Sequence, residues 1–345
     1  MKTTRKFSLV AAIALTLAAA THAADYQLIK TIPVGGDGGW DYLTVDSAAR
    51  RLYVSHATKV VVIDLDKDKA IGEITNTPGV HGIAIAPELN RGFASCGREN
   101  KAAIVDLKTL QVISKVDTGK NPDGMLYDPA QQEVYMFNGG SQSATVIDAK
   151  TGKVITTIPL GGRPEFAQVD TEVHRVYLNI EDKNEVIAID TQTHKVVNHW
   201  PIAPGEEASG MAFDQKNHRL FLGCGGSKLM AMMDSTSGKV IASVPIGDGV
   251  DANAFDAATQ LAFASCSDGT VTIAHEDGDK LVVVQTLKMA RGARTMTIDP
   301  LTHRIYLGAA EYEASTNAPA ASSKRPRPKM VAGSFKILVF GSDPK

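Results

Sequence analysis

The chain has 345 residues and carries 36 basic residues (Lys and Arg) against 38 acidic ones, a formal net charge of −2. This near balance gives the protein as a whole no electrostatic attraction to nucleic acid or to an acidic membrane surface. Aromatic residues make up 6% of the chain, too few for a platform on which a single nucleic-acid strand would stack. The composition therefore gives no indication of nucleic-acid binding.

The first 23 residues have the pattern of a secretory signal peptide. Basic residues near the N-terminus precede an apolar stretch from Phe7 to Ala20, and the small residue Ala23 follows. The stretch is too short for a stable membrane span, and no cysteine follows the cleavage point to carry a lipid. We expect cleavage near Ala23, no membrane anchor, and a mature protein that is periplasmic or secreted.

Residues 24–345 repeat one pattern seven times. Each copy begins with a short apolar run that ends at an anchor position, usually Asp, and continues through polar turns into Val/Ile-rich runs. The anchors lie 40 to 44 residues apart, at Asp46, Ala86, Asp128, Asp170, Asp214, Asp256 and Asp299. Four strand-like runs at this period are typical of a β-propeller blade. The sequence predicts an all-β protein, a single-domain seven-bladed β-propeller of four-stranded blades.

The two ends of the repeat array predict how the ring closes. In the first unit we expect strands over 42–45, 52–55, 60–65 and 70–74, whereas the seventh unit stops at 335–340 and lacks a fourth strand. Residues 26–33 read like the expected outer strand at 153–159. The N-terminal strand should therefore complete blade seven and leave no open edge between the first and last blades.

One polar position recurs at the start of the innermost strand, five residues before each anchor. It is ionisable in six of the seven units: Asp41, His81, Asp123, Glu165, Ser209, Asp251 and Arg294. The positions one and three residues before the anchor are almost wholly apolar, which predicts packing between blades. Because innermost strands border the central channel, the seven polar residues should form a ring at one mouth. Trp40 is a candidate aromatic wall of that mouth, or equally a blade-packing residue.

Two interpretations of this polar ring remain open. Arg294 follows Asp251 and precedes Asp41 around the closed ring, so the charges are consistent with a salt-bridge belt that fixes the blades. However, four acids less one arginine leave a charge of −3 when His81 is neutral, an excess that a divalent cation or a cationic ligand would satisfy. The oxygen ligands suited to calcium, magnesium, manganese or zinc are those of Asp41, Asp123, Glu165 and Asp251.

A bound metal would also allow catalysis at the ring. His81 would act as general acid or base, and Arg294 would bind a substrate carboxylate or an oxyanion. The reaction would be hydrolysis of a lactone or ester, or a lyase step. No nucleophile elbow, dinucleotide-binding loop or haem-attachment motif occurs, so these three chemistries have no support in the sequence.

The three cysteines occupy one repeated position, ten residues after the anchor: Cys96, Cys224 and Cys266. Equivalent positions in different blades are too far apart for a direct disulfide, so we interpret the cysteines as small packing residues. The alternative is a soft-metal site shared by Cys96 and His56, which hold this position in neighbouring units.

The link between the second and third strands of the seventh unit is unusually long. Residues 312–331 are rich in Pro, Ala and Ser and include the basic run 324–329. Links of this kind lie on the same side of a propeller as the polar ring. We therefore expect either a basic lid that folds over the ring or a solvated loop.

Two groups of motifs carry a family resemblance. They are Arg51-Leu52-Tyr53-Val54-Ser55-His56 followed by Val61-Val62-Ile63-Asp64, and Thr151-Gly152-Lys153-Val154 leading to Ile158-Pro159-Leu160-Gly161-Gly162. The chain thereby resembles the YVTN-type β-propeller repeat family, particularly its exported YncE-like branch, over essentially residues 24–345. It departs from the family at the Asn position ten residues past each anchor, because only Asn138 keeps it.

Two classes of function follow. The resemblance implies a binding or scaffold protein, which we expect to be a monomer that captures a small molecule, a metal or a partner's protein segment at the channel mouth. The ring itself keeps open a metal-dependent hydrolase or lyase. We favour the binding protein, because the resemblance implies a family whose members are more often binding modules.

Overall fold

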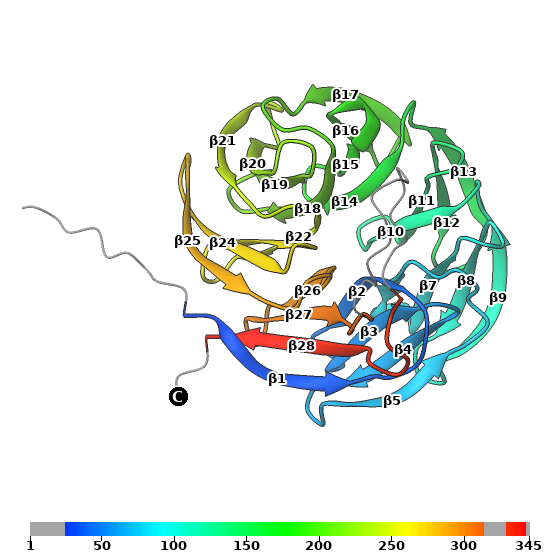
Figure 1. The fold of residues 1–345 in the computed structure, drawn as a ribbon. Helices are drawn as coiled ribbons and strands as arrows, with labels where there is room; N and C mark the ends of the chain where they lie inside the picture. The colour runs from blue at the N-terminus through cyan, green and yellow to red at the C-terminus, as the bar shows by residue number, and fades with distance from the viewer. Residues whose placement is uncertain (1–24, 314–328, 343–345) are drawn as a thin grey trace, which may run out of the picture.

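The computed structural model describes residues 25–313 and 329–342. These residues form seven four-stranded antiparallel sheets that stand as blades around a central axis (Figure 1). The predicted seven-bladed β-propeller is confirmed. Among the described residues, no helix is long and apolar enough to span a membrane. The expected signal peptide lies outside the described residues.

In blades one to six the strands follow the chain from the axis outwards. Blade one comprises β2 (Trp40–Asp46), β3 (Arg51–His56), β4 (Lys59–Asp64) and β5 (Lys69–Ile74). Blade two comprises β6 (Ile83–Ala86), β7 (Arg91–Cys96), β8 (Lys101–Asp106) and β9 (Gln111–Asp117). Blade three comprises β10 (Pro122–Asp128), β11 (Glu133–Asn138), β12 (Ser143–Asp148) and β13 (Val154–Pro159).

The remaining blades continue around the ring. Blade four comprises β14 (Pro164–Asp170), β15 (Arg175–Ile180), β16 (Glu185–Asp190) and β17 (Lys195–Pro201). Blade five comprises β18 (Ala208–Asp214), β19 (Arg219–Cys224), β20 (Leu229–Asp234) and β21 (Val240–Pro245). Blade six comprises β22 (Val250–Asp256), β23 (Leu261–Cys266), β24 (Thr270–Asp277) and β25 (Lys280–Lys288). Blade seven comprises β26 (Met296–Asp299), β27 (Arg304–Ala309), β28 (Lys336–Gly341) and β1 (Gln27–Pro33).

The recurrent aspartates at strand ends form the turns. Asp128 Oδ1 accepts the N–H groups of Ala130 at 2.9 Å and Gln131 at 3.4 Å, and Asp214 makes the same pair of bonds in blade five. Such a carboxylate accepts hydrogen bonds from the backbone N–H groups two and three residues later. These bonds replace the strand-to-strand bonds that the backbone no longer makes once the strand has ended. The anchor aspartates are therefore structural, and blade two, which has Ala86 instead, turns through the short helix η1 (Pro87–Leu89).

Apolar side chains fill the spaces between neighbouring blades. The second and third strands are buried on both faces, since each blade is covered by two others. The position three residues before the anchor is buried in most blades, as predicted. The position one residue before it is only partly buried, and Phe213, Phe255 and Ile298 pack against the clusters between blades, as predicted, while they also line the channel.

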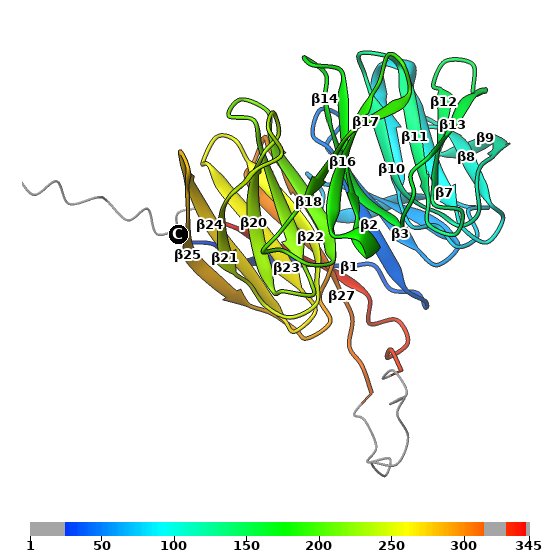
Figure 2. The same ribbon diagram turned by 90° about the horizontal axis from the view of Figure 1, so that it is seen from above.

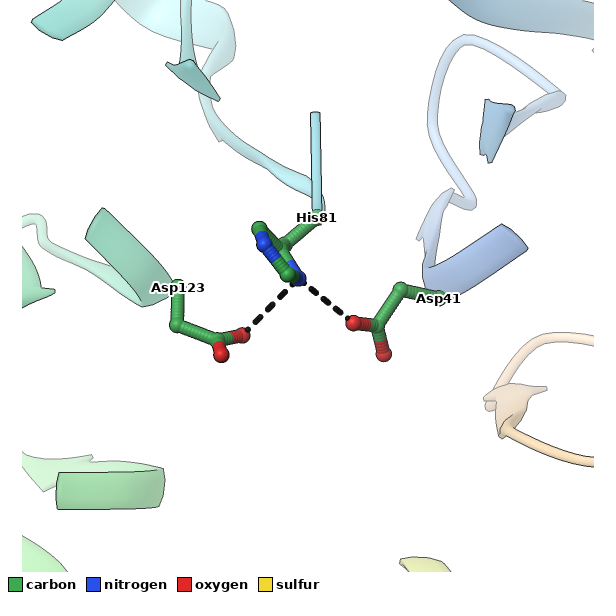
Figure 3. Close-up of side chains that lie close together, drawn as sticks. All are labelled: Asp41, His81 and Asp123. Atoms are coloured by element: carbon green, nitrogen blue, oxygen red, sulfur yellow. Dashed lines mark hydrogen bonds and ion pairs between the residues drawn. The ribbon is translucent and has the colours of Figure 1, made fainter. Parts of the chain in front are cut away.

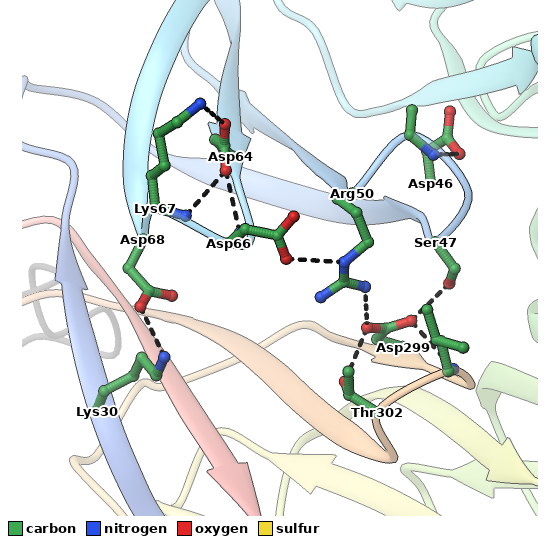
Figure 4. Close-up of polar contacts among 12 residues, drawn as sticks. Lys30, Asp46, Ser47, Arg50, Asp64, Asp66, Lys67, Asp68, Asp299 and Thr302 are labelled. Carbon is green, nitrogen blue, oxygen red and sulfur yellow. Dashed lines mark hydrogen bonds and ion pairs between the residues drawn. The ribbon is translucent and has the colours of Figure 1, made fainter.

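The ring closes as predicted. Strand β1 pairs antiparallel with β28, with Thr31 opposite Leu338 and Pro33 opposite Lys336. Polar contacts join blades seven and one at the opposite face from the ring residues (Figure 4). Arg50 Nη1 lies 2.6 Å from Asp299 Oδ2, and the Ser47 hydroxyl donates to Asp299 Oδ1 at 2.6 Å. At the periphery, Lys30 Nζ lies 2.6 Å from Asp68 Oδ2.

The long link of blade seven leaves the ring on the side where β27 ends. Figure 2 shows its described ends projecting from that face, in orange and red. They form a short bridge between Tyr312 and Met330, and Glu313 N–H donates to Lys329 O at 2.8 Å. Residues 314–328 lie outside the described residues, so the basic lid stays a prediction.

The contacts between blades seven and one predict two different losses of stability. The Asp299 side chain is fully buried and accepts hydrogen bonds from Ser47, Arg50 and Thr302, so Asp299→Ala should lower the free energy of unfolding by about 2–4 kcal/mol. Asp68→Ala removes an ion pair whose side chains are about one-third exposed and should lower it by less than about 1 kcal/mol. Urea unfolding at pH 7 measures both, and equal losses would contradict the prediction.

Candidate binding site at the channel mouth

The residues of the polar ring sit where the innermost strand is irregular. Pairing between the first and second strands shifts register between Trp40 and Leu43 in blade one and between Pro122 and Met125 in blade three. Such bulges bend a strand and re-aim a side chain. In blade one the backbone N–H of Asp41 donates to the Ser55 hydroxyl at 2.9 Å, which fixes the irregular segment to the neighbouring strand.

Three residues from blades one, two and three meet at the mouth. Figure 3 shows His81 between Asp41 and Asp123. Its Nδ1 lies 2.8 Å from Asp41 Oδ2 and 3.3 Å from Asp123 Oδ1. One ligand atom from each residue lies within 4.8 Å of those of the other two, and each side chain is about 30% exposed. These three residues, the mouth triad, could therefore act on one ligand.

The charges of the mouth triad depend on one another. Burial disfavours a charged His81, but the hydrogen bond to Asp41 and the charges of Asp123 and Asp41 outweigh it and raise the pKa of His81 above its ordinary value. Burial raises the pKa of Asp123 to about 6, against the lowering effect of His81. The two carboxylates thus favour the protonated form of His81, and His81 in turn lowers the pKa of Asp123.

Blade four contributes a second acidic pair, and one of its two residues was not predicted from the sequence. Glu181 opens the short helix η2 (Glu181–Lys183), directly after β15, and lies beside Glu165. Burial first, then the charges of Asp123 and Glu181 and a hydrogen bond with Glu181, raise the pKa of Glu165 well above its ordinary value. Arg163 forms an ion pair with Glu181, and its Nε lies 3.9 Å from Glu165 Oε1. The repeat held one signal that could have identified Glu181. At the position eleven residues after the anchor, blade four alone has a charged residue.

The remaining ring residues form looser contacts. Arg294 Nη1 lies 3.4 Å from Asp251 Oδ2, an ion pair without a hydrogen bond, and the Arg294 side chain is 46% exposed. Burial raises the pKa of Asp251 to about 6, although Arg294 lowers it. The Ser209 hydroxyl donates to Val250 O of blade six at 3.0 Å, so it links two blades.

Trp40 is a packing residue, not a wall of the mouth. Its side chain is buried, its ring stacks on Phe335 at 4.7 Å, and its Nε1–H donates to Arg294 O at 2.5 Å. Both partners belong to blade seven. Trp40 therefore supports the site indirectly, by fixing the backbone that carries Arg294.

The alternative soft-metal site is not formed. His56 is buried and its ring lies 4.6 Å from Phe335, between blades seven and one. Cys96 is buried with Val60 and Ile83, between blades one and two. All three cysteines are buried free thiols, as expected for packing residues.

An aromatic pair lies just behind the ring, and sequence reasoning missed it. Tyr42 and Phe166, each one residue after a ring residue, meet across the channel with their ring centroids 4.4 Å apart. The same position holds Gly82 and Gly124 in the intervening blades, where a Cβ at Gly82 would lie 2.7 Å from Tyr42 Cβ. The sequence held a signal for this pair. The position directly after each ring residue is aromatic in two blades and glycine in three.

The mouth as a whole has more acidic than basic groups. Five carboxyl groups, including Glu181, less the guanidinium groups of Arg163 and Arg294 leave a formal charge of −3 when His81 is neutral. Burial first, and then neighbouring carboxyl groups, raise the pKa values of three of them: Asp123, Glu165 and Asp251. A bound cation would relieve that unfavourable charge.

Comparison with known proteins identifies the fold. Among solved structures 1714 chains match, including a chain of the crystal structure of the mitotic checkpoint complex. That chain superposes with a TM-score of 0.75 at 10% sequence identity, covering 99% of this chain and 98% of its own. At such identity the likeness shows the fold alone. No family model and no curated protein sequence matches this chain.

The raised pKa of Glu165 predicts how stability changes with pH. The folded protein holds this proton more tightly than the unfolded chain does, so the resulting stability is present below about pH 4.5 and is lost as pH rises through the raised pKa. The free energy of unfolding of the parent protein should therefore fall between pH 5 and 9. In Glu165→Gln this fall should be smaller by about 1–3 kcal/mol.

Urea unfolding across this pH range measures the effect. Glu172→Gln is the matched control, because Glu172 is an exposed residue in a turn of the same blade. If both variants follow the parent protein, Glu165 does not retain its proton.

Proposed function

We propose that this protein is an exported YVTN-type propeller that works as a monomeric binding protein, with a cation held at the channel mouth. Its repeat motifs support the family, and the N-terminal pattern of basic and apolar residues supports export. A propeller fold suits a binding or scaffold role, because loops and strand ends from seven blades surround one channel.

One observation carries the choice of ligand. The mouth triad brings two carboxylate oxygens and an imidazole nitrogen within 4.8 Å of one another, in a mouth with excess negative charge. Two oxygens and one nitrogen suit a hard or borderline divalent ion such as Mn²⁺ or Zn²⁺. The proton on His81 Nδ1 would leave when the ion binds, because a metal ligand must be deprotonated.

The other ring residues would serve the ion without binding it directly. Asp251 comes from blade six and adds negative potential to the same mouth. Arg294 is half exposed beside Asp251, where it would attract an anionic group that accompanies the ion. The salt-bridge belt is the competing interpretation, and it requires no ligand.

A metal-dependent hydrolase or lyase of the lactone or ester class is a second candidate. The observation in its favour is Glu165, whose raised pKa leaves a protonated carboxyl group at the mouth, as a general acid requires. His81→Ala separates the two functions. In a binding protein it changes only affinity, whereas in an enzyme it abolishes turnover of a lactone or ester while the fold stays intact.

Calorimetric titration of the purified protein with Mn²⁺ and Zn²⁺ tests the proposal. We expect one ion per chain, an affinity about tenfold or more weaker in Asp41→Asn and Asp123→Asn, and weaker binding at pH 5.5 than at pH 8 because protons compete for the ligands. Asp117→Asn is the control, since that carboxylate is exposed at the end of β9.

Arg294→Ala distinguishes the cation site from the salt-bridge belt. Removing this positive charge should tighten ion binding, because the mouth becomes more negative. If no ion binds, or if both aspartate variants bind as the parent does, the belt is the correct interpretation.

A further inference from the structure

A histidine is buried without a hydrogen bond where the first and last blades meet. His56 ends β3 and is 1% exposed, and neither of its ring nitrogens has a hydrogen-bond partner of ordinary geometry among the described residues. Its ring centroid lies 4.6 Å from that of Phe335 in blade seven, which also stacks on Trp40. Buried polar groups are normally hydrogen-bonded, so an imidazole in this state requires an explanation.

A glycine-rich segment, residues 34–39, covers this histidine. It leads from β1 in blade seven to β2 in blade one and contains four glycines. A Cβ at Gly36 would lie 2.8 Å from His56 Cε1, so the backbone of the segment lies directly against the imidazole. Gly36 also has a φ of 80°, which glycine adopts without strain. Water can therefore reach the ring on this side only when the segment moves.

Backbone hydrogen bonds hold the glycine-rich segment at its two ends. Near β1 the N–H groups of Val34 and Gly35 donate to Phe335 O at 3.0 and 2.9 Å. Near β2 the Ala57 N–H donates to Gly39 O at 2.9 Å. The residues between these ends are exposed and carry no apolar side chain. A segment with so little buried apolar surface opens at a lower free-energy cost than the blades do.

The surroundings of His56 favour its neutral form. Burial first, and then the charge of Lys59 on β4, lower the pKa of His56 below its ordinary value. The Gly38 carbonyl group and the carboxylates of Glu73 and Asp37 act in the opposite direction and do not outweigh these two effects. Glu73, on β5, is already paired with Lys59 at 2.5 Å. Blade seven presents an aromatic ring, which offers no counter-charge. A proton on His56 would therefore be poorly compensated while the junction stays closed.

We propose that His56 and the glycine-rich segment form an acid-sensitive latch, in which a proton on the imidazole opens the segment while the seven blades stay folded. Because the closed junction favours the neutral ring, its stability is present above about pH 6.5 and is lost as pH falls below that value. The charged ring is stabilised by water, and the segment is the part of the junction that opens most easily. The segment leads into β2, so its opening would also loosen Asp41. The latch itself requires no bound cation.

Two measurements on the whole protein between about pH 8 and about pH 5 test the latch. Trp40 is one of two tryptophans and stacks on Phe335, so in a Trp200→Phe background its fluorescence reports exposure of the junction. Hydrogen exchange, corrected for the pH dependence of the chemical step, follows the amides of Val34 and Gly35. We expect Trp40 to become exposed and these amides to exchange about tenfold faster or more at the acidic end. The circular dichroism spectrum and exchange in β15 should not change.

Two replacements remove the titrating group. His56→Asn and His56→Ile introduce the residue types that occupy the same repeated position in blades three and four, where Asn138 and Ile180 are buried. Both variants should keep the segment closed over the whole pH range. Circular dichroism checks folding, and either folded variant decides the result. His199→Asn is the matched control, because the His199 side chain is 58% exposed on the outer strand β17, and it should open as the parent protein does.

The proposal is overturned if the parent protein shows no opening down to about pH 5, or if a folded His56 variant opens as the parent does. His81→Gln identifies the competing source of a pH effect, since His81 titrates at the mouth. An opening that survives in the His56 variants and disappears in His81→Gln originates at the mouth triad. All of these measurements are made without a metal ion, so failure of the latch is distinguishable from failure of the cation site.

Discussion

The pairing of β1 with β28 is the constraint on which the rest of the structure depends. It joins segments from opposite ends of the chain, such as Thr31 and Leu338, and so converts a row of blades into a closed ring. A channel with seven walls exists only after this closure, because the innermost strands of blades one and seven become neighbours there. The contacts that frame the mouth follow from it: Trp40 Nε1–H donates to Arg294 O, and the Thr295 hydroxyl donates to Asp41 O. Loss of closure would therefore open the core and the mouth together.

The closed ring brings together groups that would otherwise avoid one another. Elsewhere in the chain the aspartates are neutralised locally, as at Asp299, or accept backbone N–H groups in turns, as at Asp128. At the mouth the carboxyl groups instead lie close to other carboxyl groups, and burial raises the pKa values of Asp123 and Asp251 to about 6. Local consistency gives way here, as it does at functional sites, and among the described residues the buried Glu276 beside Asp214 shows the same effect. A salt-bridge belt alone would favour a closer balance between acidic and basic groups.

The sequence predicts most of the fold and only part of the site. The repeat sets the blade number, the closing strand and the ring positions from Asp41 to Arg294, because each follows from one spacing. The spacing does not predict Glu181, because this residue lies in the link between the second and third strands of blade four, where a short helix replaces the usual turn. Tyr42 and Phe166 escape it as well, because their meeting depends on side chains from blades one and four crossing the channel. For Trp40 the sequence left two roles open, a wall of the mouth and a packing residue, and the structure places its buried ring against Phe335 between blades.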